Sequence, residues 1–493
     1  MSGRSRTTGP CLTAARSGLS RRTAMTFTAT HGSGRHAIVI GGGIAGLSAA
    51  RVLTEHFDRV TVLERDKPQS GAEHRAGVPQ ARHVHILLAG GEQGLEALFP
   101  GLREELTAAG APWGDYAGTS LINFPIFRLP HSTSGVEVSF ASRPFREYTM
   151  RCRLERGGRV EFRHGVQVKG LVGEGHGVSG VKIRDSRGED VLRADFVVAA
   201  CGREGRVDEW LAELGYSTPR EETVDAALSY STRWYRGPRS LSRYNLVVDL
   251  PTPPDLPRGG GFMSCEDGKW FVTLMGIAGE RAPLDEEGFN AWVRNLRFPE
   301  VWDLVQKAEP ASPIYGSAKT ENRHRHFEEL KRFPDRFVAL GDAVASFNPM
   351  YGQGMTMAVL GAMELAACLA EQRERIGGPS LVGLSRRFQR RLARVLQSVW
   401  GMAITEDFRW SATRGERPGG ISRVVGKYMD ELMNTVPDDE LVFQKFVRVQ
   451  HLLDPVSALL APDVAGRVIE RATRPVRAGV REVVGGLVQQ VGG

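Results

Sequence analysis

Apolar residues occur along this chain in short runs that are typical of buried β-strands. Such runs lie at 37–40, 60–63, 196–200 and 337–340, with few polar residues inside them. Parallel strands that are covered on both faces have this composition, and helices must connect them. Helical spacing of apolar residues is found at Leu47–Leu53, Ile86–Phe99, Arg143–Arg156 and Met355–Arg373. The alternation of strands and helices predicts an α/β fold.

A second pattern, of antiparallel strands, interrupts this α/β pattern twice. Val160–Val168 is expected to form one strand, followed by a small meander over 178–184 and 190–193. Residues 206–320 form a longer excursion with strands and helices predicted at 226–235, 244–249, 260–265, 269–277, 286–296 and 299–308. A block of antiparallel strands inserted into a nucleotide-binding fold is typical of a substrate domain.

These patterns divide the chain into four parts. The leader is 1–35, which is rich in Ser, Thr, Gly and Arg and is expected to be disordered. A discontinuous nucleotide-binding domain comprises 36–120, 143–205 and 321–375. The substrate domain comprises 121–142 and 206–320, and residues 376–493 are expected to form a helical C-terminal region.

A glycine fingerprint follows the first strand. Gly41, Gly43 and Gly46 have the G-x-G-x-x-G spacing between a strand and a helix. The first glycine makes a tight turn, the second lets the backbone approach a pyrophosphate, and the third lets the helix pack closely on the strand. The second strand then ends in Glu64, about 20 residues later, where a ribose hydroxyl needs an acceptor. Together these residues predict a dinucleotide site.

The last buried strand carries a second set of cofactor signals. It ends in Gly341-Asp342, and a glycine-containing loop then leads to a new helix near Gly354. An acid at a strand end can accept a hydrogen bond from a ribityl hydroxyl, and a helix N-terminus stabilises negative charge. With Glu64, this accounts for both ends of an FAD. The loop Arg75–His85 is rich in Arg, His and Gln, which suits an anionic ligand or, alternatively, a solvated basic loop.

Composition and charge exclude several other classes of protein. The net charge is +7, but six arginines in residues 1–35 supply most of it, so nucleic acid is not an expected partner. Five scattered cysteines lack metal-type spacing and indicate a reducing compartment, so the cytoplasm is predicted. We expect no metal site, no Ser-His-Asp constellation and no apolar run long enough to span a bilayer.

Six stretches carry a resemblance to a known family. They are Gly41–Gly46, Glu64-Arg65-Asp66, Arg75–His85, Ser142-Arg143-Pro144, Ala200–Arg203 and Leu340–Gly354. The chain resembles the FAD-dependent monooxygenases that include squalene epoxidase and the bacterial polyether epoxidases. The run at 77–83 is the most specific. The resemblance implies a Rossmann-like FAD domain of the glutathione-reductase type, as in class A/E flavin monooxygenases, with an inserted β-sheet substrate domain.

The resemblance also implies roles for individual residues. Glu64 would hold the adenosine ribose, Arg75 and Arg143 would lie along the diphosphate and ribityl chain, and Val168 would lie near adenine. Tyr351 would lie on the substrate side of the flavin ring. The full set implied to bind FAD is Gly41, Gly43, Ile44, Ala45, Gly46, Glu64, Arg65, Arg75, Gln80, Arg143, Val168, Gly202, Arg203, Gly341, Asp342, Pro349, Gly352, Gly354 and Met355.

The implied activity is epoxidation of an alkene in an apolar polyketide or terpenoid intermediate, with O2 as co-substrate, through a flavin C4a-hydroperoxide. Aromatic or polyketide hydroxylation and reduction of isoprenoid double bonds are alternatives, and a flavoprotein scaffold without activity is a third. The halogenase signature Trp-x-Trp-x-Ile-Pro is absent from the sequence. Electrons would come from NADPH, NADH or a partner flavin reductase, because the sequence has no second glycine fingerprint and Cys201-Gly202-Arg203 replaces the Asp-Gly motif of many hydroxylases.

Two sets of side chains can be interpreted either as purely structural or as functional. Phe124, Phe127, Phe262, Trp270, Phe271 and Met275 either line a substrate pocket or form ordinary sheet core. Beyond Val464, five arginines recur at helical spacing: Arg467, Arg471, Arg474, Arg477 and Arg481. A basic amphipathic helix can lie on an anionic membrane, but the same pattern arises when valines pack on the protein and arginines face water. Pro475 favours the second interpretation.

Overall fold

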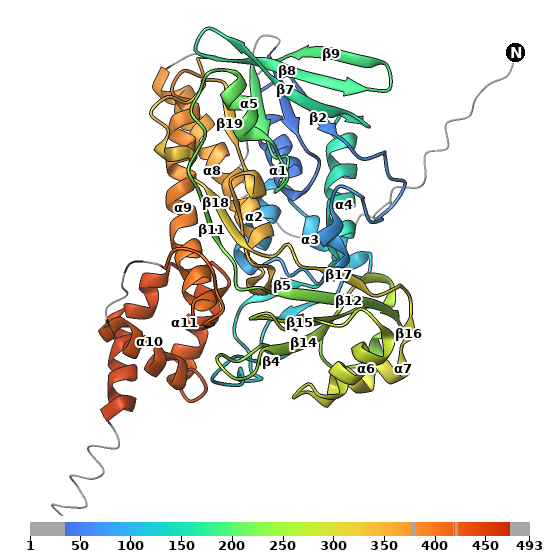
Figure 1. Cartoon of the computed structure of the whole chain (residues 1–493), viewed down its shortest axis with the longest axis vertical. Coiled ribbons are helices and arrows are strands. Elements are labelled where there is room, and N and C mark those ends of the chain that lie inside the picture. The colour runs from blue at the N-terminus through green and yellow to red at the C-terminus, as the bar shows by residue number, and fades with distance from the viewer. Residues whose placement is uncertain (1–34, 377–379, 418, 420–422, 474–493) are drawn as a thin grey trace, which may run out of the picture.

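The computed structural model describes residues 35–376, 380–417, 419 and 423–473. At its centre lies a five-stranded parallel sheet, and Figure 1 shows this domain above a second sheet. The strand order is β19 (Phe337–Ala339), β10 (Phe196–Ala199), β1 (His36–Ile40), β2 (Arg59–Glu64) and β6 (Val160–His164). All four pairings are parallel. The carboxyl ends of these strands therefore share one edge, where ligands bind in open α/β sheets.

Helices cover this sheet on both faces, as its buried strands require. The helices of this domain are α1 (Ile44–Leu53), α2 (Ala89–Leu98), α3 (Leu102–Ala108), α4 (Arg143–Arg156) and α8 (Gln353–Ile376). Their apolar sides join the strands in one core. The α4 helix has the bounds that the sequence predicts. Helix α2 begins at Ala89 and not at Ile86, and residues 86–88 have no helical structure.

The strand expected over Val160–Val168 is two strands. Gly165 has a φ of 68° and breaks the extended backbone after β6. The chain then enters a separate antiparallel meander of β7 (Gln167–Glu174), β8 (Gly177–Asp185) and β9 (Gly188–Arg193). This meander lies at the top of the molecule in Figure 1. Glycine can adopt a positive φ without the steric penalty that other residues meet, so the chain can turn here. The apolar pattern does not show this turn, and the sequence therefore predicts a single strand.

A seven-stranded sheet forms the substrate domain in the lower half of Figure 1. Its strands are β4 (Ser120–Asn123), β12 (Ser229–Arg236), β13 (Leu246–Asp249), β14 (Arg258–Ser264), β15 (Lys269–Gly276), β16 (Glu309–Pro310) and β17 (Tyr315–Ser317). The helices α6 (Glu286–Arg294) and α7 (Pro299–Lys307) pack against one face of it. A smaller pair, β3 (Trp113–Asp115) and β5 (Glu137–Ser139), lies beside this sheet.

The substrate domain begins later than residue 206, where the sequence pattern sets its boundary. Helix α5 (Val207–Glu213) buries its apolar residues in the core of the nucleotide-binding domain. Strand β11 (Glu221–Val224) pairs with β18 (Asn322–Arg325), which in turn pairs with β20 (Ala345–Ser346). Strands β11 and β18 are about 100 residues apart in the sequence, so local sequence patterns do not reveal their pairing.

The C-terminal region is helical, as predicted. Helix α9 (Leu384–Asp407) runs along the nucleotide-binding domain and is followed by α10 (Arg423–Thr435), α11 (Glu440–Gln450) and a helical segment over 462–473 (Figure 1). The sequence suggested no segment long enough to span a bilayer. Among the described residues, Gln353–Arg375 within α8 meets that length and composition, and 61% of its apolar window is buried inside the protein.

The basic segment after Val464 packs on the protein over the part that the structure describes. Val464 and Val468 are buried in the apolar cluster beneath the substrate sheet. Arg467 and Arg471 bind Asp439 and Asp438, each at 2.8 Å. Arg474, Arg477 and Arg481 lie outside the described residues. Up to residue 473 the segment therefore has the arrangement of a surface helix, and membrane contact stays a prediction.

Candidate functional site

Glycines bring three strand ends together at the carboxyl edge of the parallel sheet. Gly41 has a φ of 103°, and a Cβ on it would lie 2.5 Å from the carbonyl oxygen of Ala200. A Cβ on Gly46 would lie 1.8 Å from the Gly41 carbonyl oxygen, and one on Gly341 would lie 2.7 Å from the Cβ of Ala45. Larger residues would separate these backbones, so the spacing in the sequence serves close packing here.

Gly43 has a different environment, made of charged side chains. A Cβ on Gly43 would lie 3.6 Å from Oε1 of Glu147 and 3.7 Å from Nη2 of Arg143. Gly43 also precedes α1, whose first amides point toward this turn. Backbone amides and an arginine at a helix N-terminus form a site that suits a pyrophosphate. The fingerprint glycines and Arg143 therefore lie together, as the sequence predicts.

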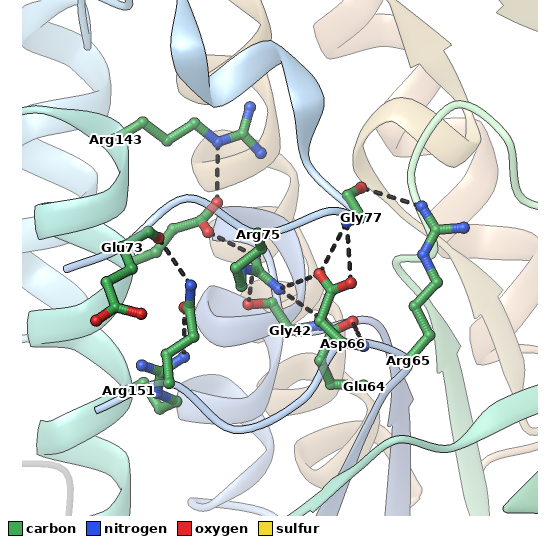
Figure 2. Close-up of polar contacts among 11 residues, drawn as sticks. Gly42, Glu64, Arg65, Asp66, Glu73, Arg75, Gly77, Arg143 and Arg151 are labelled. Carbon is green, nitrogen blue, oxygen red and sulfur yellow. Dashed lines mark hydrogen bonds and ion pairs between the residues drawn. The ribbon is translucent and has the colours of Figure 1, made fainter. Parts of the chain in front are cut away.

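Glu64 ends β2 at the same edge and is buried. Its Oε2 accepts hydrogen bonds from the Gly42 amide at 2.9 Å and from Nη1 of Arg75 at 2.6 Å. Its Oε1 accepts from the Asp66 amide at 3.0 Å (Figure 2). These donors fix the carboxylate at the end of β2, beside the fingerprint turn.

Arg75 lies between two carboxylates rather than extended along an open groove. Its Nη1 binds Glu64, and its Nη2 binds Oε2 of Glu147 at 2.5 Å. Nε of Arg143 binds the other oxygen of Glu147 at 2.9 Å (Figure 2). We name Glu64, Arg75, Arg143 and Glu147 the arginine–carboxylate cluster. In it Arg75 holds Glu64, and both arginines reach the Gly43 turn: Nη2 of Arg143 and Nη2 of Arg75 lie 3.7 and 3.9 Å from a Cβ built on Gly43.

Charges within the arginine–carboxylate cluster compensate for burial. Burial alone would raise the pKa of Glu147, but Arg143 and Arg75 outweigh it and hold that pKa below its usual value. Burial would likewise lower the pKa of Arg75, but Glu147 and Glu64 raise it. Sequence reasoning missed Glu147. Its spacing of four residues from Arg143 on one helix was the available signal.

The loop after β2 closes on the same cluster. Both carboxylate oxygens of Asp66 accept from the Gly77 amide, at 2.9 and 3.0 Å, and Nη2 of Arg65 donates to the Gly77 carbonyl at 3.1 Å (Figure 2). Gln80 lies just beyond, in the short helix η1 (Pro79–Arg82), and is half-buried. The loop is thus held by specific bonds and is not a freely solvated basic segment.

The end of this loop lies against the substrate sheet. Nδ1 of His83 lies 2.8 Å from Oγ1 of Thr232, and Nε1 of Trp234 donates to the Arg82 carbonyl at 2.9 Å. Burial, and then the charge of Arg82, lower the pKa of His83 to about 4, so its imidazole is neutral near pH 7. His85 bonds instead to the backbone oxygen of His83, which is the common role of a loop histidine.

Asp342 lies at the end of β19 among three arginines. Burial raises the pKa of its carboxyl group, and Arg143, Arg203 and Arg323 act in the opposite direction. Arg203 itself pairs with Glu321 at 2.5 Å and follows Gly202, whose φ is 74°. The third strand end therefore presents an acid near Arg143, one of the two arginines that reach the Gly43 turn.

Val168 does not belong to the parallel sheet. It belongs to β7 of the meander and is half-buried against the core of the nucleotide-binding domain. Strand β7 contacts β2, the strand that ends in Glu64. A place for Val168 near adenine stays a prediction.

The loop that leads into α8 offers open backbone. Pro349–Tyr351 form the short helix η6, Gly352 follows with a φ of 67°, and α8 starts at Gln353. No atom lies within 4 Å of a Cβ built on Gly354, whereas Met355 is buried. A planar ring can therefore approach the first turn of α8 at Gly354, where amide groups favour negative charge.

Tyr351 takes part in a buried network that the sequence did not predict. Its hydroxyl donates to Oδ1 of Asp407 at 2.7 Å, and Nδ2 of Asn348 donates to the same oxygen at 2.9 Å. Nδ2 of Asn322 donates to Oδ2 at 2.5 Å. We name Asp407, Asn322, Asn348 and Tyr351 the Asp407 cluster. Asp407 comes from the last turn of α9, so the C-terminal region holds the loop at the edge of the site.

Asp407 is fully buried and has neutral partners. Burial raises the pKa of its carboxyl group to about 6, although hydrogen bonds from Tyr351, Asn348 and Asn322 partly oppose this. Nothing in the local sequence marks Asp407, because it lies in a helix whose other residues have an ordinary amphipathic pattern.

The expected pocket residues divide between the two faces of the substrate sheet. Phe262 and Trp270 pack under α6 and α7, on the far face. Phe271 and Met275 alternate with Trp270 and point to the other face, where Met275 joins Tyr230, Met350 and Trp410. Phe124 and Phe127 pack on Phe446 of α11. For Phe124, Phe127, Phe262 and Trp270 the sheet-core interpretation is therefore the better one.

Over residues 35–383 the sequence matches the family described as FAD binding domain. The chain belongs to this family. FAD is accordingly its cofactor, and the chain is an enzyme of the FAD-dependent monooxygenase family. The predicted fold class is confirmed, because the family matches and solved structures of the flavin-dependent brominase Bmp2 and of PqsL share this fold, with TM-scores of 0.60 and 0.56.

Three similar proteins illustrate this relationship. Protein Rv3254 of Mycobacterium tuberculosis is 32% identical over 89% of this chain and 94% of its own length. The 6-methylpretetramide 4-monooxygenase of Streptomyces rimosus is 26% identical over 68% of this chain and 74% of its own length. The structure of PqsL, a probable FAD-dependent monooxygenase from Pseudomonas aeruginosa, has a TM-score of 0.56 at 16% identity, covering 83% of this chain and 98% of PqsL.

Proposed function

We propose that this enzyme adds one atom of O2 to an apolar polyketide or terpenoid substrate, and that epoxidation of an alkene is its main reaction. The observation that carries the proposal is a cluster of packed apolar side chains that includes Tyr230, Met275, Met350 and Trp410, which we name the apolar wall. Tyr230 and Met275 belong to the substrate sheet, Met350 lies in the loop before α8, and Trp410 follows α9. It adjoins Tyr351, at the end of the FAD site that is opposite to Glu64.

The residues of this site fit FAD. The Gly43 turn with Arg143 suits the pyrophosphate, Glu64 suits the adenosine ribose, Asp342 suits the ribityl chain, and Gly354 leaves space at the first turn of α8. When bound, FAD supplies the reduction of O2 and the transfer of one oxygen atom to the substrate. We propose NADPH, NADH or a partner flavin reductase as the source of electrons.

The protein's own contribution is to position the substrate and to exclude water. An isolated alkene needs no acid or base from the protein, and the side chains of the apolar wall are those of methionine, tyrosine and tryptophan. The His83 ring lies with its centroid 6.0 Å from that of Tyr230, and this imidazole is neutral near pH 7. These surroundings favour a substrate whose reacting part is apolar.

A second candidate is hydroxylation of an aromatic ring. A phenolic substrate becomes more reactive when a group nearby takes its proton, and the Asp407 cluster provides a buried carboxylate with a pKa of about 6 behind Tyr351. The relative from Streptomyces rimosus is named as a 4-monooxygenase of 6-methylpretetramide, which also supports this candidate.

Mass spectrometry under ¹⁸O2 tests the proposal. The purified enzyme, FAD and NADPH are incubated with a panel of polyenes, terpenoid alkenes and phenolic polyketides. Incorporation of one ¹⁸O atom into an alkene is the expected result, and incorporation only into phenols would favour the second candidate. Equal turnover without oxygen would move the enzyme to the reductases. The absence of any substrate-dependent consumption of NADPH, with a flavin reductase supplied, would indicate a non-catalytic flavoprotein.

A further inference from the structure

Two histidines and a glutamate lie together on the side of the molecule that α9 covers. They are His324 on β18, His326 immediately after it, and Glu328 in the short helix η4 (Phe327–Glu329). Alternate residues of an extended chain point to the same face, and the two imidazole centroids are 4.0 Å apart. The sequence predicts no metal site, yet one potential ligand atom from each residue lies within 4.8 Å of the other two.

His324 is buried without any hydrogen-bond partner in the described structure. Its exposed fraction is 4%, and both Nδ1 and Nε2 are buried and unpaired. Burial, followed by the charge of His326, lowers the pKa of His324 to about 4, so the ring is neutral. An unpaired polar ring in the interior is unfavourable, and a phenylalanine would pack on Trp400 without that loss. A neutral imidazole with a free lone pair is, however, the form that binds metals.

His326 already has the surroundings of a metal-binding histidine. Its Nδ1 lies 2.8 Å from Oε1 of Glu328, and its Nε2 lies 3.2 Å from Oε2 of Glu222 on β11. Glu222 is in turn fixed by Nε1 of Trp400, which donates to its other oxygen at 3.2 Å. A carboxylate on the second ring nitrogen orients metal-bound histidines in many proteins and raises their basicity.

We propose that His324, His326 and Glu328 bind a divalent transition metal of the Zn²⁺ class, with Glu222 as the positioning residue of His326. The metal takes the place of the proton on Nδ1 of His326, which is released to solvent, and Glu328 then binds the metal instead of this proton. Two imidazoles and one carboxylate are a common ligand set for Zn²⁺, and a water molecule can complete the tetrahedron.

The charges around the cluster suit a divalent cation. Glu222, Glu328 and Glu329 face His326, and Arg220 is the cation beside them, 2.9 Å from Glu329 and 3.7 Å from Glu222. One arginine does not neutralise three carboxylates. The bound metal would link β18 and β11 next to Trp400 of α9, and β18 pairs with β20, which leads toward Asn348. The site is separate from the proposed FAD contacts.

Zinc binding by the full-length, FAD-loaded chain without an affinity tag tests this proposal. The protein is stripped with a chelator, dialysed against buffered micromolar Zn²⁺, and its zinc content is measured by plasma mass spectrometry. We expect one zinc ion per chain in the wild type and in His74→Asn. The control His74 is a half-buried histidine whose two nitrogens are also unpaired, but it lies outside the cluster.

Variants of the cluster make the test specific. Glu328→Gln and His324→Asn should each lose stoichiometric zinc, and Glu222→Gln should weaken binding by roughly 10–100-fold, as outer carboxylates do. Glu328 lies at the surface edge of the cluster, so its variant keeps the test valid if the histidine variant does not fold. A wild-type chain that takes up no zinc, or a Glu328→Gln chain that takes up as much as wild type, would overturn the proposal.

Discussion

Two buried groups of polar residues lie at opposite ends of the proposed FAD site. Each contains a buried carboxylate, and the two groups stabilise it in different ways. The arginine–carboxylate cluster places two carboxylates against two arginines, whereas the Asp407 cluster surrounds one carboxylate with two amides and a phenol. The pKa of Glu147 in the first is below its usual value, and that of Asp407 in the second is raised to about 6. Both carboxylates are buried, so the difference comes from the charge of the partners.

This comparison separates two uses of a buried acid. Full positive charges keep Glu147 ionised over the physiological range, so the arginine–carboxylate cluster is a fixed support for Glu64 and Arg143. Neutral donors stabilise a carboxylate less, so Asp407 can change its protonation state near neutral pH. The adenosine end of the site is therefore expected to be insensitive to pH, and the loop before α8 is expected to respond to it.

Removing the cation of the first cluster should have the largest effect. Arg75→Met leaves Glu64 and Glu147 buried without their shared partner, and loss of one member of a buried ion pair lowers the free energy of unfolding by about 3–5 kcal/mol. Urea denaturation measures this change, and absorbance at the flavin band measures the accompanying loss of FAD.

Arg153→Met is the matched control for this variant. Arg153 also lies on the cluster's helix, α4, and binds Glu105 at 2.5 Å, but both side chains are partly exposed. Its loss should lower the free energy of unfolding by about 1 kcal/mol or less from the ion pair. If Arg75→Met were no more destabilising than Arg153→Met, burial would not distinguish these pairs, and the comparison would fail.

The next effect is a change in the pH dependence of stability. Because the pKa of Asp407 is higher in the folded than in the unfolded chain, its stabilising contribution is complete below about pH 4 and is lost as pH rises through about 6. From about pH 5 to about pH 7 this group alone should lower the free energy of unfolding by about 1 kcal/mol. Asp407→Asn should lack that change.

Urea titrations of both chains across this range provide the measurement. The variant loses hydrogen bonds at every pH, which gives a constant offset, so only the slope of the difference is informative. The difference should shift in favour of Asp407→Asn as pH increases. A difference that stays constant with pH would show that Asp407 does not titrate there.

The smallest expected effect comes from the phenol of the same cluster. Tyr351→Phe removes one donor to Asp407, with a loss in the free energy of unfolding of about 1 kcal/mol, and it should move the pH transition of stability upward. Tyr428→Phe is the control, because its hydroxyl binds the backbone oxygen of Leu459 and no ionisable group. An equal pH profile in the two variants would argue against the Asp407 cluster as a unit.

The same contrast explains what the sequence reveals. The signals for the adenosine end lie within short segments of the sequence: glycine spacing, an acid at a strand end and an arginine at a helix start. Gly41, Gly46 and Glu64 could therefore be predicted from the sequence. Glu147 needed only the spacing of four residues to Arg143. The sequence places Arg75 along the diphosphate, which stays a prediction, but it does not show the ion pair that Arg75 makes with Glu147.

The flavin end depends on contacts between distant segments. Asp407 meets Tyr351 and Asn322 across 56 and 85 residues, and neither separation leaves a periodic signal. The pairing of β11 with β18 likewise joins distant segments, and it places the start of the substrate domain after residue 206. Alternation along β15 is visible in the sequence, but which face meets the FAD domain depends on packing, so the pocket candidates could not be sorted.

Three strand ends of the parallel sheet are proposed to form one FAD site. The most direct test is the flavin content of the purified chain, measured by absorbance and by release of the cofactor on denaturation. The wild type should hold one FAD per chain, Glu64→Ala and Asp342→Ala should each hold less, and the double variant should hold little while it keeps a cooperative unfolding transition. A folded double variant that retained full FAD occupancy would contradict the account.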